Sequence, residues 1–352
     1  MPTWRDYVRT VIPYTPGEQP KEADVVKLNT NENPYPPAPG VGRVLQETDA
    51  SLLRRYPDPA ITDLAQALAD TYGVKKEQVF VGVGSDDVLA MCFLTFFGSS
   101  LPILFPDITY SFYDVWADLF RIPYAQVPLD ENFCIRVADY ACQNGGVVIA
   151  NPNAPTGVAL PLSAIEEVLE ANRDHVVIVD EAYVDFDCPS ALPLIEKYDN
   201  LLVVQTMSKS RALAGMRIGY CFGQEELIRC LQDVKYSFNS YTMNRLSIAC
   251  GVAALEDKAY FEEKRDELIA TREWSKEELK KLGFSFGDSK ANFIFASHRE
   301  MPAKEIFESL KKKHIYVRYW SKPRINNHLR ISIGTREEME KLFSALREIL
   351  GA

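Results

Sequence analysis

Short apolar runs alternate with helical patterns between about residues 60 and 235, and this alternation is the strongest constraint on the fold. QVFVGVG precedes SDDVLAMCFLTFF, LPILF precedes TYSFYDVWADLF, and GGVVIANP precedes LSAIEEVLEAN; HVVIVDEA, LLVVQTMS and RIGYCFG complete the series. The runs are rich in Val and Ile and apolar throughout, which is typical of central strands in a sheet covered on both faces. Strands and helices in alternation predict an α/β layered fold.

The segments on either side of this region have a different texture. Residues 1–42 are rich in Pro and Asn and predict an irregular arm. A long charged helical stretch over 243–282 is followed by NFIFAS, IYVR and LRISIG, which read as three strands, with helices near 303–313 and 335–350. This mixture predicts a smaller α+β domain. The expected division is an arm, a large domain and a small domain, over residues 1–42, 43–240 and 241–352.

Two of the expected helices begin with the pattern of a capping box. Ser163 is followed three residues later by Glu166, and Thr335 by Glu338. In this arrangement each side chain accepts a hydrogen bond from the backbone N–H of the other residue. We therefore expect helices to start at both places.

Composition narrows the class of protein. A net charge of −10 over 352 residues argues against a general nucleic-acid binder, although it allows a local anion pocket. Seven scattered cysteines without a C-x-x-C pair, and four distant histidines, show no zinc-ligand spacing and suit a reducing compartment. The N-terminus has no apolar signal region, and the longest apolar stretch is too short to span a bilayer. We expect a cytoplasmic protein without a membrane or nucleic-acid partner or a bound metal.

Polar residues that follow the predicted strands are the candidates for chemistry, because ligands of α/β sheets bind at the carboxyl ends of the strands. In VGVGSDDVL, Ser85 and Asp86 open a helix whose backbone N–H groups can bind an anion, although either residue could be a plain N-cap. In NPNAPTG, two prolines and a glycine predict a rigid loop that presents Asn153, with a purely structural turn as the alternative.

The next two strand ends carry charged residues. VIVDEAYVDF ends a strand in Asp180, with Tyr183 close behind; such a carboxylate is a metal ligand, a base or a partner for a cofactor, unless it only caps a helix. TMSKSRALAGMR supplies Lys209 and Arg217. A partly desolvated lysine beside other cations is a nucleophile that forms Schiff bases, and arginine offers a fork for phosphate. The alternative, that Lys209 and Arg217 are two solvated surface charges, fits poorly with the apolar character of LLVVQTM before them and of AGMRIGY around Arg217.

Two arginines lie in the apolar strands of the small domain. Arg318 belongs to IYVRYW and Arg330 to HLRISIGT. Arginine in such a place favours recognition of a carboxylate or a phosphate. A buried structural ion pair is the alternative.

The order of these features resembles the aspartate-aminotransferase superfamily, the class I and II aminotransferases of fold type I. Within it, LNTNENPYPP, LRRYPDP, NPNAPTG and LRISIGT look most like the histidinol-phosphate aminotransferases. The resemblance covers nearly the whole chain. It implies a large domain with a mostly parallel seven-stranded sheet between helices, and a small α+β domain. The arm would be part of the small domain and would cover the active site. The resemblance also implies pyridoxal 5′-phosphate as cofactor and a homodimer with shared active sites.

The resemblance also implies roles for individual residues. Lys209 would hold the cofactor as a Schiff base and move protons. Asp180 would pair with the pyridinium nitrogen, and Tyr183 and Asn153 would hydrogen-bond the ring oxygen. The cofactor phosphate would be bound by Ser85, Asp86, Ser208 and Arg217. Tyr110 would stack on the ring, and Tyr56 would reach the phosphate of the partner subunit's cofactor.

The implied reaction is transfer of the amino group of histidinol phosphate to 2-oxoglutarate, in histidine biosynthesis. Arg330 would bind the α-carboxylate of glutamate and share the phosphate of the other substrate with Arg318 and Tyr14, and the loop that contains Asn33 would cover the site. An aromatic-amino-acid aminotransferase and a threonine-phosphate decarboxylase of the same lineage remain alternatives. A non-catalytic regulatory protein of this fold would have lost Lys209 or Asp180, and both are present.

The chain departs from the family pattern at two places. Ala154 replaces the second Asn of NPNNPTG, which we expect to matter little because Asn153 is kept. Arg211 stands where small or aromatic residues are usual, and we expect it to add positive charge beside Lys209.

Overall fold

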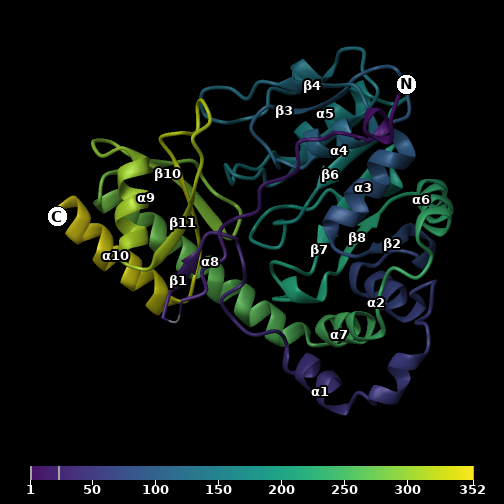
Figure 1. The fold of residues 1–352 in the computed structure, drawn as a ribbon, viewed down its shortest axis with the longest axis horizontal. Helices are drawn as coiled ribbons and strands as arrows, with labels where there is room; N and C mark the ends of the chain where they lie inside the picture. Colours follow the sequence, from purple (N-terminus) through teal and green to yellow (C-terminus); the bar gives the residue numbers. More distant parts are fainter. Residues whose placement is uncertain (1, 23, 352) are drawn as a thin grey trace.

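The computed structural model describes residues 2–22 and 24–351, which form two β-sheets with helices packed around each (Figure 1). The larger sheet lies within residues 79–222. The smaller sheet combines one strand from the N-terminal arm with four strands from residues 284–332. The functional residues predicted above are therefore distributed over two separate sheets.

The larger sheet has seven strands in the order β2-β8-β7-β6-β5-β3-β4. Neighbouring strands are parallel, except that β8 is antiparallel to both β2 and β7. The seven strands are β2 (Val79–Gly82), β3 (Ile103–Pro106), β4 (Tyr124–Val127), β5 (Val147–Ala150), β6 (Val177–Asp180), β7 (Leu201–Thr206) and β8 (Gly219–Phe222). The predicted α/β class, with a mostly parallel seven-stranded sheet, is confirmed. The edge strand β4 escaped prediction because its sequence, YAQV, is a short run interrupted by Gln126, and none of its residues is fully buried.

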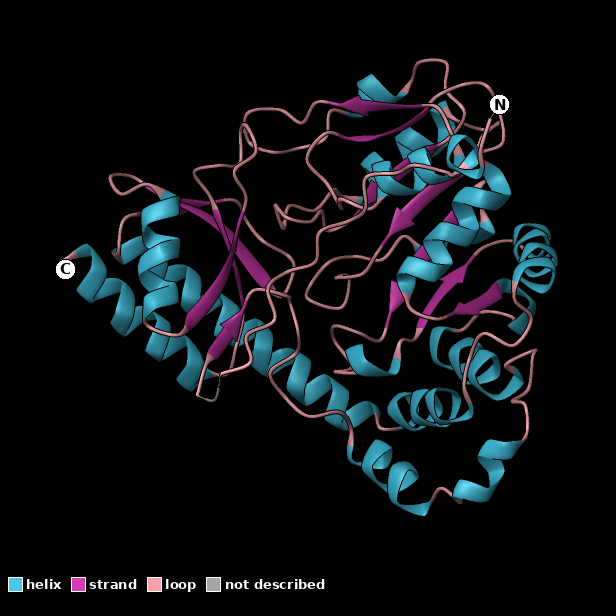
Figure 2. Ribbon diagram, in the orientation of Figure 1, coloured by secondary structure: helices cyan, strands magenta, loops and turns pink. Residues whose placement is uncertain are grey.

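Helices cover both faces of this sheet, as Figure 2 shows. The helices of the described chain are α1 (Pro39–Glu47), α2 (Thr62–Tyr72), α3 (Ser85–Phe96), α4 (Tyr113–Phe120), α5 (Leu162–Ala171), α6 (Glu225–Phe238), α7 (Arg245–Glu256), α8 (Lys258–Lys281), α9 (Ala303–Lys312) and α10 (Arg336–Leu350), with short 3-10 turns between them. The predicted helices near 303–313 and 335–350 are confirmed as α9 and α10. The stretch predicted over 243–282 is two helices, because Asp257 ends α7 and caps α8.

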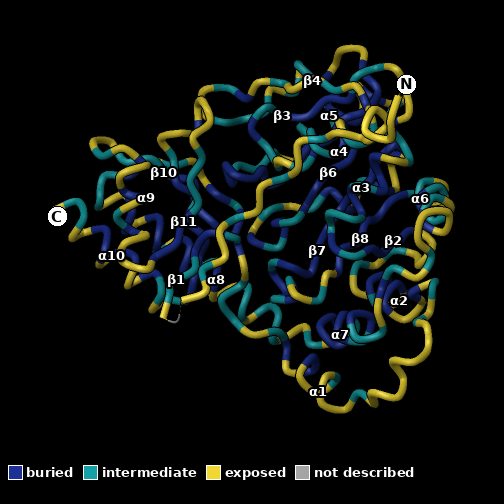
Figure 3. Tube along the Cα trace, viewed as in Figure 1, coloured by how far each residue is buried: buried dark blue, intermediate teal, exposed yellow. Residues whose placement is uncertain are grey.

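Alternate strand residues enter opposite faces of the larger sheet, as the two-residue period of a strand requires. Ile178 packs in a cluster with side chains of α3, α4 and α6. Its neighbours Val177 and Val179 pack in a second cluster with α2, α5 and α7. Both faces are thus buried (Figure 3), which explains why the strand runs are apolar at every position.

The smaller sheet has the order β1-β11-β12-β10-β9. Its strands are β1 (Val26–Leu28), β9 (Phe284–Phe286), β10 (Phe293–His298), β11 (Ile315–Tyr319) and β12 (Leu329–Ser332). The three strands predicted here are confirmed, and β9 and β1 are additional. The expectation of an arm that is irregular throughout is wrong, because β1 pairs in parallel with β11. The division into arm, large domain and small domain stays a prediction.

Before it reaches β1, the arm runs past α4 of the larger sheet (Figure 1). Tyr14 stacks on Phe112 with ring centroids 4.2 Å apart, and the Arg9 guanidinium donates to the carbonyl of Leu119. The arm therefore contacts the layers of both sheets.

One of the two predicted capping boxes forms. The Thr335 hydroxyl accepts the Glu338 N–H at 3.2 Å, and the Glu338 carboxylate accepts the Thr335 N–H at 2.8 Å. The box predicted at Ser163 is wrong, since α5 starts at Leu162 after Pro161. Glu166 binds Lys197 and Tyr198 instead.

Over residues 2–22 and 24–351, no helix combines the length and the apolar character that crossing a membrane requires. The same residues contain no group of three or more His, Cys, Asp or Glu side chains arranged to bind a metal ion.

Glu181 directly follows β6 and is a buried acid, with 1% of its surface exposed. Its carboxylate accepts hydrogen bonds from the Ser190 hydroxyl (2.6 Å), the Ala191 N–H (2.5 Å) and the Gln205 amide (2.8 Å). Burial nevertheless raises the pKa of Glu181 to about 7.

We predict that Glu181 makes the folded state less stable as the pH rises. Because the folded chain holds this proton more tightly than the unfolded chain, the free energy of unfolding should fall by about 3 kcal/mol from this group between pH 5 and pH 8. Glu181→Gln should remove this part of the pH dependence in urea unfolding, whereas the exposed Glu77→Gln should not. Equal slopes for wild type and Glu181→Gln would contradict the prediction.

Candidate active site

Two adjoining cavities lie between the carboxyl ends of the larger sheet and strands β11 and β12 of the smaller one. The larger has a volume of about 540 Å³ and the smaller about 180 Å³. Five residues line both cavities: Thr30, Tyr110, Ala154, Tyr183 and Lys209. The arm and both sheets contribute to the lining, so the site forms only in the folded chain.

Lys209 stands where the two cavities meet. It follows β7 in the turn that leads to β8, and its Nζ lies 5.6 Å from the ring centroid of Tyr183. Among the described residues no hydrogen bond or ion pair engages its Nζ, and the side chain lines both cavities, so the amine can meet a ligand from either one.

Asp180 ends β6 in the floor of the smaller cavity. Its Oδ2 accepts the Tyr113 hydroxyl at 2.7 Å, and its Oδ1 accepts the Ala182 N–H at 3.2 Å. Burial raises the pKa of Asp180 to about 6, while the positive charge of Lys209 opposes the rise. A buried carboxylate of this kind binds a cationic N–H donor strongly. Sequence reasoning missed Tyr113, which reads as one more core aromatic of α4.

The smaller cavity has the groups of an anion site at one end. Ser85 opens α3, and Ser208 and Arg217 line the cavity beside it. A Cβ on Gly84, whose φ is +89°, would lie 2.5 Å from Nη2 of Arg217, so only glycine lets the guanidinium come this close to the helix end. Helix N–H groups, hydroxyls and a guanidinium together suit a phosphate.

Asp86 contributes to this site through its neighbours. Its Oδ1 accepts the Tyr110 hydroxyl at 2.8 Å, and its Oδ2 lies 3.4 Å from Nη2 of Arg217. The carboxylate therefore orients Tyr110 and Arg217, while the backbone of Asp86 belongs to the helix N-terminus. Burial raises the pKa of Tyr110 well above its usual value, so its hydroxyl stays protonated.

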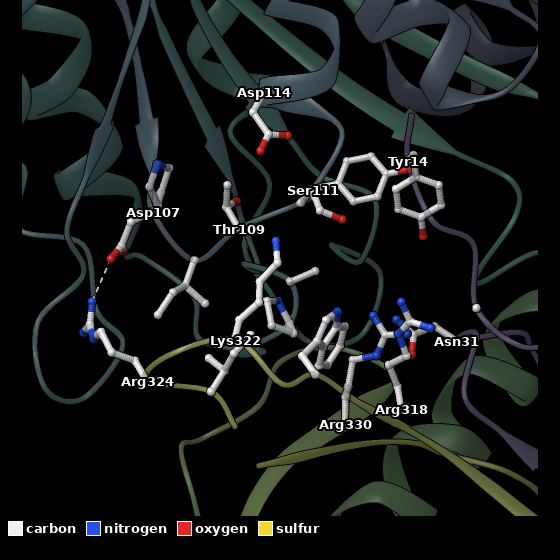
Figure 4. Close-up of a pocket in the computed structure, with 18 of the residues that line it drawn as sticks. Tyr14, Asn31, Asp107, Thr109, Ser111, Asp114, Arg318, Lys322, Arg324 and Arg330 are labelled. Atoms are coloured by element: carbon white, nitrogen blue, oxygen red, sulfur yellow. Dashed lines mark hydrogen bonds and ion pairs between the residues drawn. The ribbon is translucent and has the colours of Figure 1, made fainter. Parts of the chain in front are cut away.

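The larger cavity has two arginines on the side of the smaller sheet (Figure 4). Arg318 and Arg330 are register partners on β11 and β12, and both guanidinium groups lie over Trp320, 5.2 and 5.3 Å from its ring centroid. Nη2 of Arg330 donates to the Asn29 carbonyl at 2.8 Å, and burial lowers the pKa of Arg330.

Within the part of the chain that the structure describes, no carboxylate forms an ion pair with either arginine. The alternative of a structural ion pair is therefore wrong, and Nε of Arg330 is buried without a partner among these residues. Two adjacent guanidinium groups without a counter-ion favour a ligand with an anionic group.

Four other charged residues of the larger cavity were missed from the sequence. Arg324 binds Asp107 at 2.8 Å, and Lys322 extends from the same loop. Asp114, at the start of α4, forms no ion pair within residues 2–22 and 24–351. Figure 4 shows its carboxylate on the opposite side of the cavity from Arg318 and Arg330. Tyr14, which the sequence analysis named, lines this cavity as well.

Two predicted asparagines do not line either cavity. Asn153 accepts the Thr109 hydroxyl and donates to the Ile108 carbonyl and the Thr156 hydroxyl, so its amide is fully used within the protein. Ala154 faces the cavities instead. The residue that replaces the second Asn of the family motif thus lies at the site, and the expectation that this replacement matters little stays a prediction.

Asn33 is likewise used within the protein. Its Nδ2 donates to the carbonyls of Lys209 and Ser210, both at 3.0 Å, and its Oδ1 accepts the Tyr35 N–H at 3.0 Å. It holds the backbone of the lysine turn, whereas its neighbour Asn31 lines the larger cavity.

The expectation that Arg211 places its charge beside Lys209 is wrong. Its guanidinium lies over the Phe261 ring at 4.0 Å, and Nη1 donates to the Ala254 carbonyl at 2.8 Å. The side chain turns toward α7 and α8, where a carbonyl and an aromatic face satisfy it.

Tyr56 lies away from the site of its own chain. Its side chain is 80% exposed, and its ring centroid is 4.8 Å from that of Tyr241. No cavity around Lys209 includes it.

The comparisons with known proteins agree with this geometry. Residues 23–346 match the family model of class I and II aminotransferases. Histidinol-phosphate aminotransferases of Brachyspira hyodysenteriae and of Acinetobacter baumannii strain AYE are 49% and 52% identical to the chain, over 98% of it and 98% and 96% of their own lengths. The solved structure of histidinol-phosphate aminotransferase from Sinorhizobium meliloti in complex with pyridoxal 5′-phosphate is 25% identical, with a TM-score of 0.84 over 93% of this chain and 91% of that one.

The family model covers most of the chain, and the smaller cavity combines a lysine, a buried acid and an anion site as a pyridoxal-phosphate enzyme requires. The chain therefore belongs to the class I and II aminotransferases, which use pyridoxal 5′-phosphate.

Proposed function

We propose that this enzyme transfers the amino group of L-histidinol phosphate to 2-oxoglutarate, in histidine biosynthesis. The observation that carries the proposal is the near-full-length identity of about half with two proteins named for this activity. The unpaired arginines of the larger cavity support it, because both substrates carry an anionic group beside the reacting carbon.

We assign the cofactor to the smaller cavity. When bound, pyridoxal phosphate supplies an electron sink that stabilises negative charge at the α-carbon of the substrate. Lys209 would hold the cofactor covalently through Nζ; once the substrate amine has displaced it, the free Nζ would accept the proton of the substrate α-carbon and return it to the cofactor carbon that had borne the lysine nitrogen. Asp180, with Tyr113 as its hydrogen-bond donor, stabilises a proton on the ring nitrogen. Ser85, Ser208 and Arg217 bind the phosphate, Tyr183 donates to the ring oxygen, and Tyr110 packs against the ring.

The larger cavity has opposite charges on its two sides, and this suits histidinol phosphate. Arg318 and Arg330 bind the phosphate of one substrate and the α-carboxylate of the other, and Tyr14 closes the cavity from the arm. Asp114, on the far side, accepts the N–H of the imidazole ring. A phenyl ring has no such donor, so Asp114 favours histidinol phosphate over an aromatic amino acid. Threonine phosphate lacks an aromatic N–H too.

The proposal includes a homodimer in which Tyr56 reaches the phosphate site of the partner subunit. Large apolar side chains are exposed around Tyr56, which is unusual for a surface that faces water only. They are Leu45, Leu52, Leu53, Tyr236, Phe238 and Tyr241. A second copy packed on them would shield this surface and complete the site.

The lysine assignment predicts a covalent link at one residue. Borohydride should attach the cofactor irreversibly to the wild-type chain, and peptide mass analysis should find it at Lys209 because, of the lysines in the described part of the chain, this one lines both cavities. Lys209→Ala should lose both the link and the activity. A reduced adduct on the same peptide of the variant would contradict the assignment.

The role of Asp114 predicts selective damage. Asp114→Ala should lower kcat/KM for histidinol phosphate by about 10- to 100-fold, the effect of a lost hydrogen bond to a charged group. Single-turnover mixing with glutamate, which has no imidazole, is the control and should change little. Equal losses with both donors would remove Asp114 from specificity. If wild-type enzyme reacted with phenylalanine or threonine phosphate but not with histidinol phosphate, the proposed substrate would be wrong.

Sharing of the site predicts complementation between two inactive variants. Lys209→Ala and Tyr56→Ala homodimers should each be inactive, and mixing with subunit exchange should restore about one quarter of wild-type activity. Only the mixed dimer has one site with both wild-type residues. If Tyr56 acted within its own chain, no mixture would recover activity.

A further inference from the structure

Asn31 is the buried centre of a hydrogen-bond chain that ends at Tyr183. Its side chain is 1% exposed, and its backbone has a φ of +55°, a conformation that Asn tolerates better than most residues. Its Oδ1 accepts the Ser332 hydroxyl at 2.9 Å, and its Nδ2 donates to the Tyr183 hydroxyl oxygen at 2.9 Å. The chain joins the arm, the smaller sheet and the reactive centre.

Two hydrogen bonds to Ser332 orient the amide of Asn31. The Ser332 hydroxyl oxygen accepts the backbone N–H of Asn31 at 2.9 Å and donates its single proton to Oδ1 of Asn31. This fixes Oδ1 as the acceptor and turns the NH₂ group toward Tyr183, where it can only donate.

The Tyr183 hydroxyl receives this bond and keeps one proton to donate. Tyr183 lines both cavities, and its ring lies beside Lys209. With Asn31 on one side of the oxygen, the remaining proton is directed toward the cavities, where a ligand of the site offers an acceptor.

We infer that Asn31 is a positioning residue: it sets the hydrogen-bond polarity of Tyr183, so that this hydroxyl donates to the ring oxygen of the cofactor. The inference rests on the proposed role of Tyr183. Because Asn153 is fully used within the protein and Ala154 faces the cavity, the donation from Tyr183 is the polar contact that the oxygen depends on.

The same chain links cofactor and substrate. Ser332 follows Arg330 by two residues on β12, so both side chains lie on one face of the smaller sheet. The strand that presents Arg330 to the substrate therefore also binds Asn31 through Ser332, and Asn31 in turn orients the hydroxyl proton of Tyr183.

Asn31→Asp reverses the polarity at the same size, because a carboxylate accepts the Tyr183 proton. A hydrogen bond to the ring oxygen stabilises the deprotonated, more negative form of the bound cofactor, so its loss raises the pH midpoint of the visible absorbance change of the holoenzyme. We expect a rise of about one pH unit in both Tyr183→Phe and Asn31→Asp. Ser332→Ala, which frees the amide of Asn31, should shift the midpoint less in the same direction.

The double variant separates polarity from charge. If Asn31 acts through the hydroxyl, Asn31→Asp with Tyr183→Phe has the midpoint of Tyr183→Phe alone. Additive shifts, or a shift in Tyr183→Phe without one in Asn31→Asp, would overturn the inference. No shift in Tyr183→Phe would overturn the role of Tyr183 as well. Asn292→Ala is the control, because Asn292 binds only the backbone carbonyl of Asn31 and should leave the midpoint unchanged.

Discussion

The parallel pairing of β5, β6 and β7 is the constraint on which the site depends. Ala150 pairs with Asp180, and Asp180 with Val204, so the three strands end at nearly the same level. The loops that follow them carry Ala154, Tyr183 and Lys209, which are far apart in sequence and adjoin the same cavities. Burial of the sheet on both faces holds this register, since a slip of one residue would turn apolar side chains the wrong way.

The cavities combine charges that are costly to bury alone. The Asp180 carboxylate is stabilised by the hydrogen bond from Tyr113 and by the positive charge of Lys209. Asp86 contacts both Tyr110 and Arg217. In the larger cavity, Arg318 and Arg330 have no counter-ion among residues 2–22 and 24–351. This division explains how one site can hold a cofactor tightly and still accept two different anionic substrates in turn.

The segment from Asn29 to Asn33 connects the two sheets. Asn29 accepts from Arg330, Asn31 binds Ser332 and Tyr183, and Asn33 binds the backbone of Lys209. Alternate residues of one short segment therefore contact Arg330, Tyr183 and the turn that contains Lys209. A segment that the sequence predicts as part of an irregular arm thus contacts both sheets and the lysine turn.

The sequence by itself determined the layered α/β fold, the strand ends that carry Asp180 and Lys209, and the arginines of the small domain, because these follow from local hydrophobic period and from polar residues placed after apolar runs. Only the tertiary structure decided which way side chains point once the loops are packed. In the folded chain Asn153 points into the protein and Ala154 lines the cavity. Arg211 packs on Phe261. Tyr113 binds Asp180, and Asn31 binds Tyr183. Orientation and long-range partners depend on contacts between segments distant in the chain, and no local pattern contains that information.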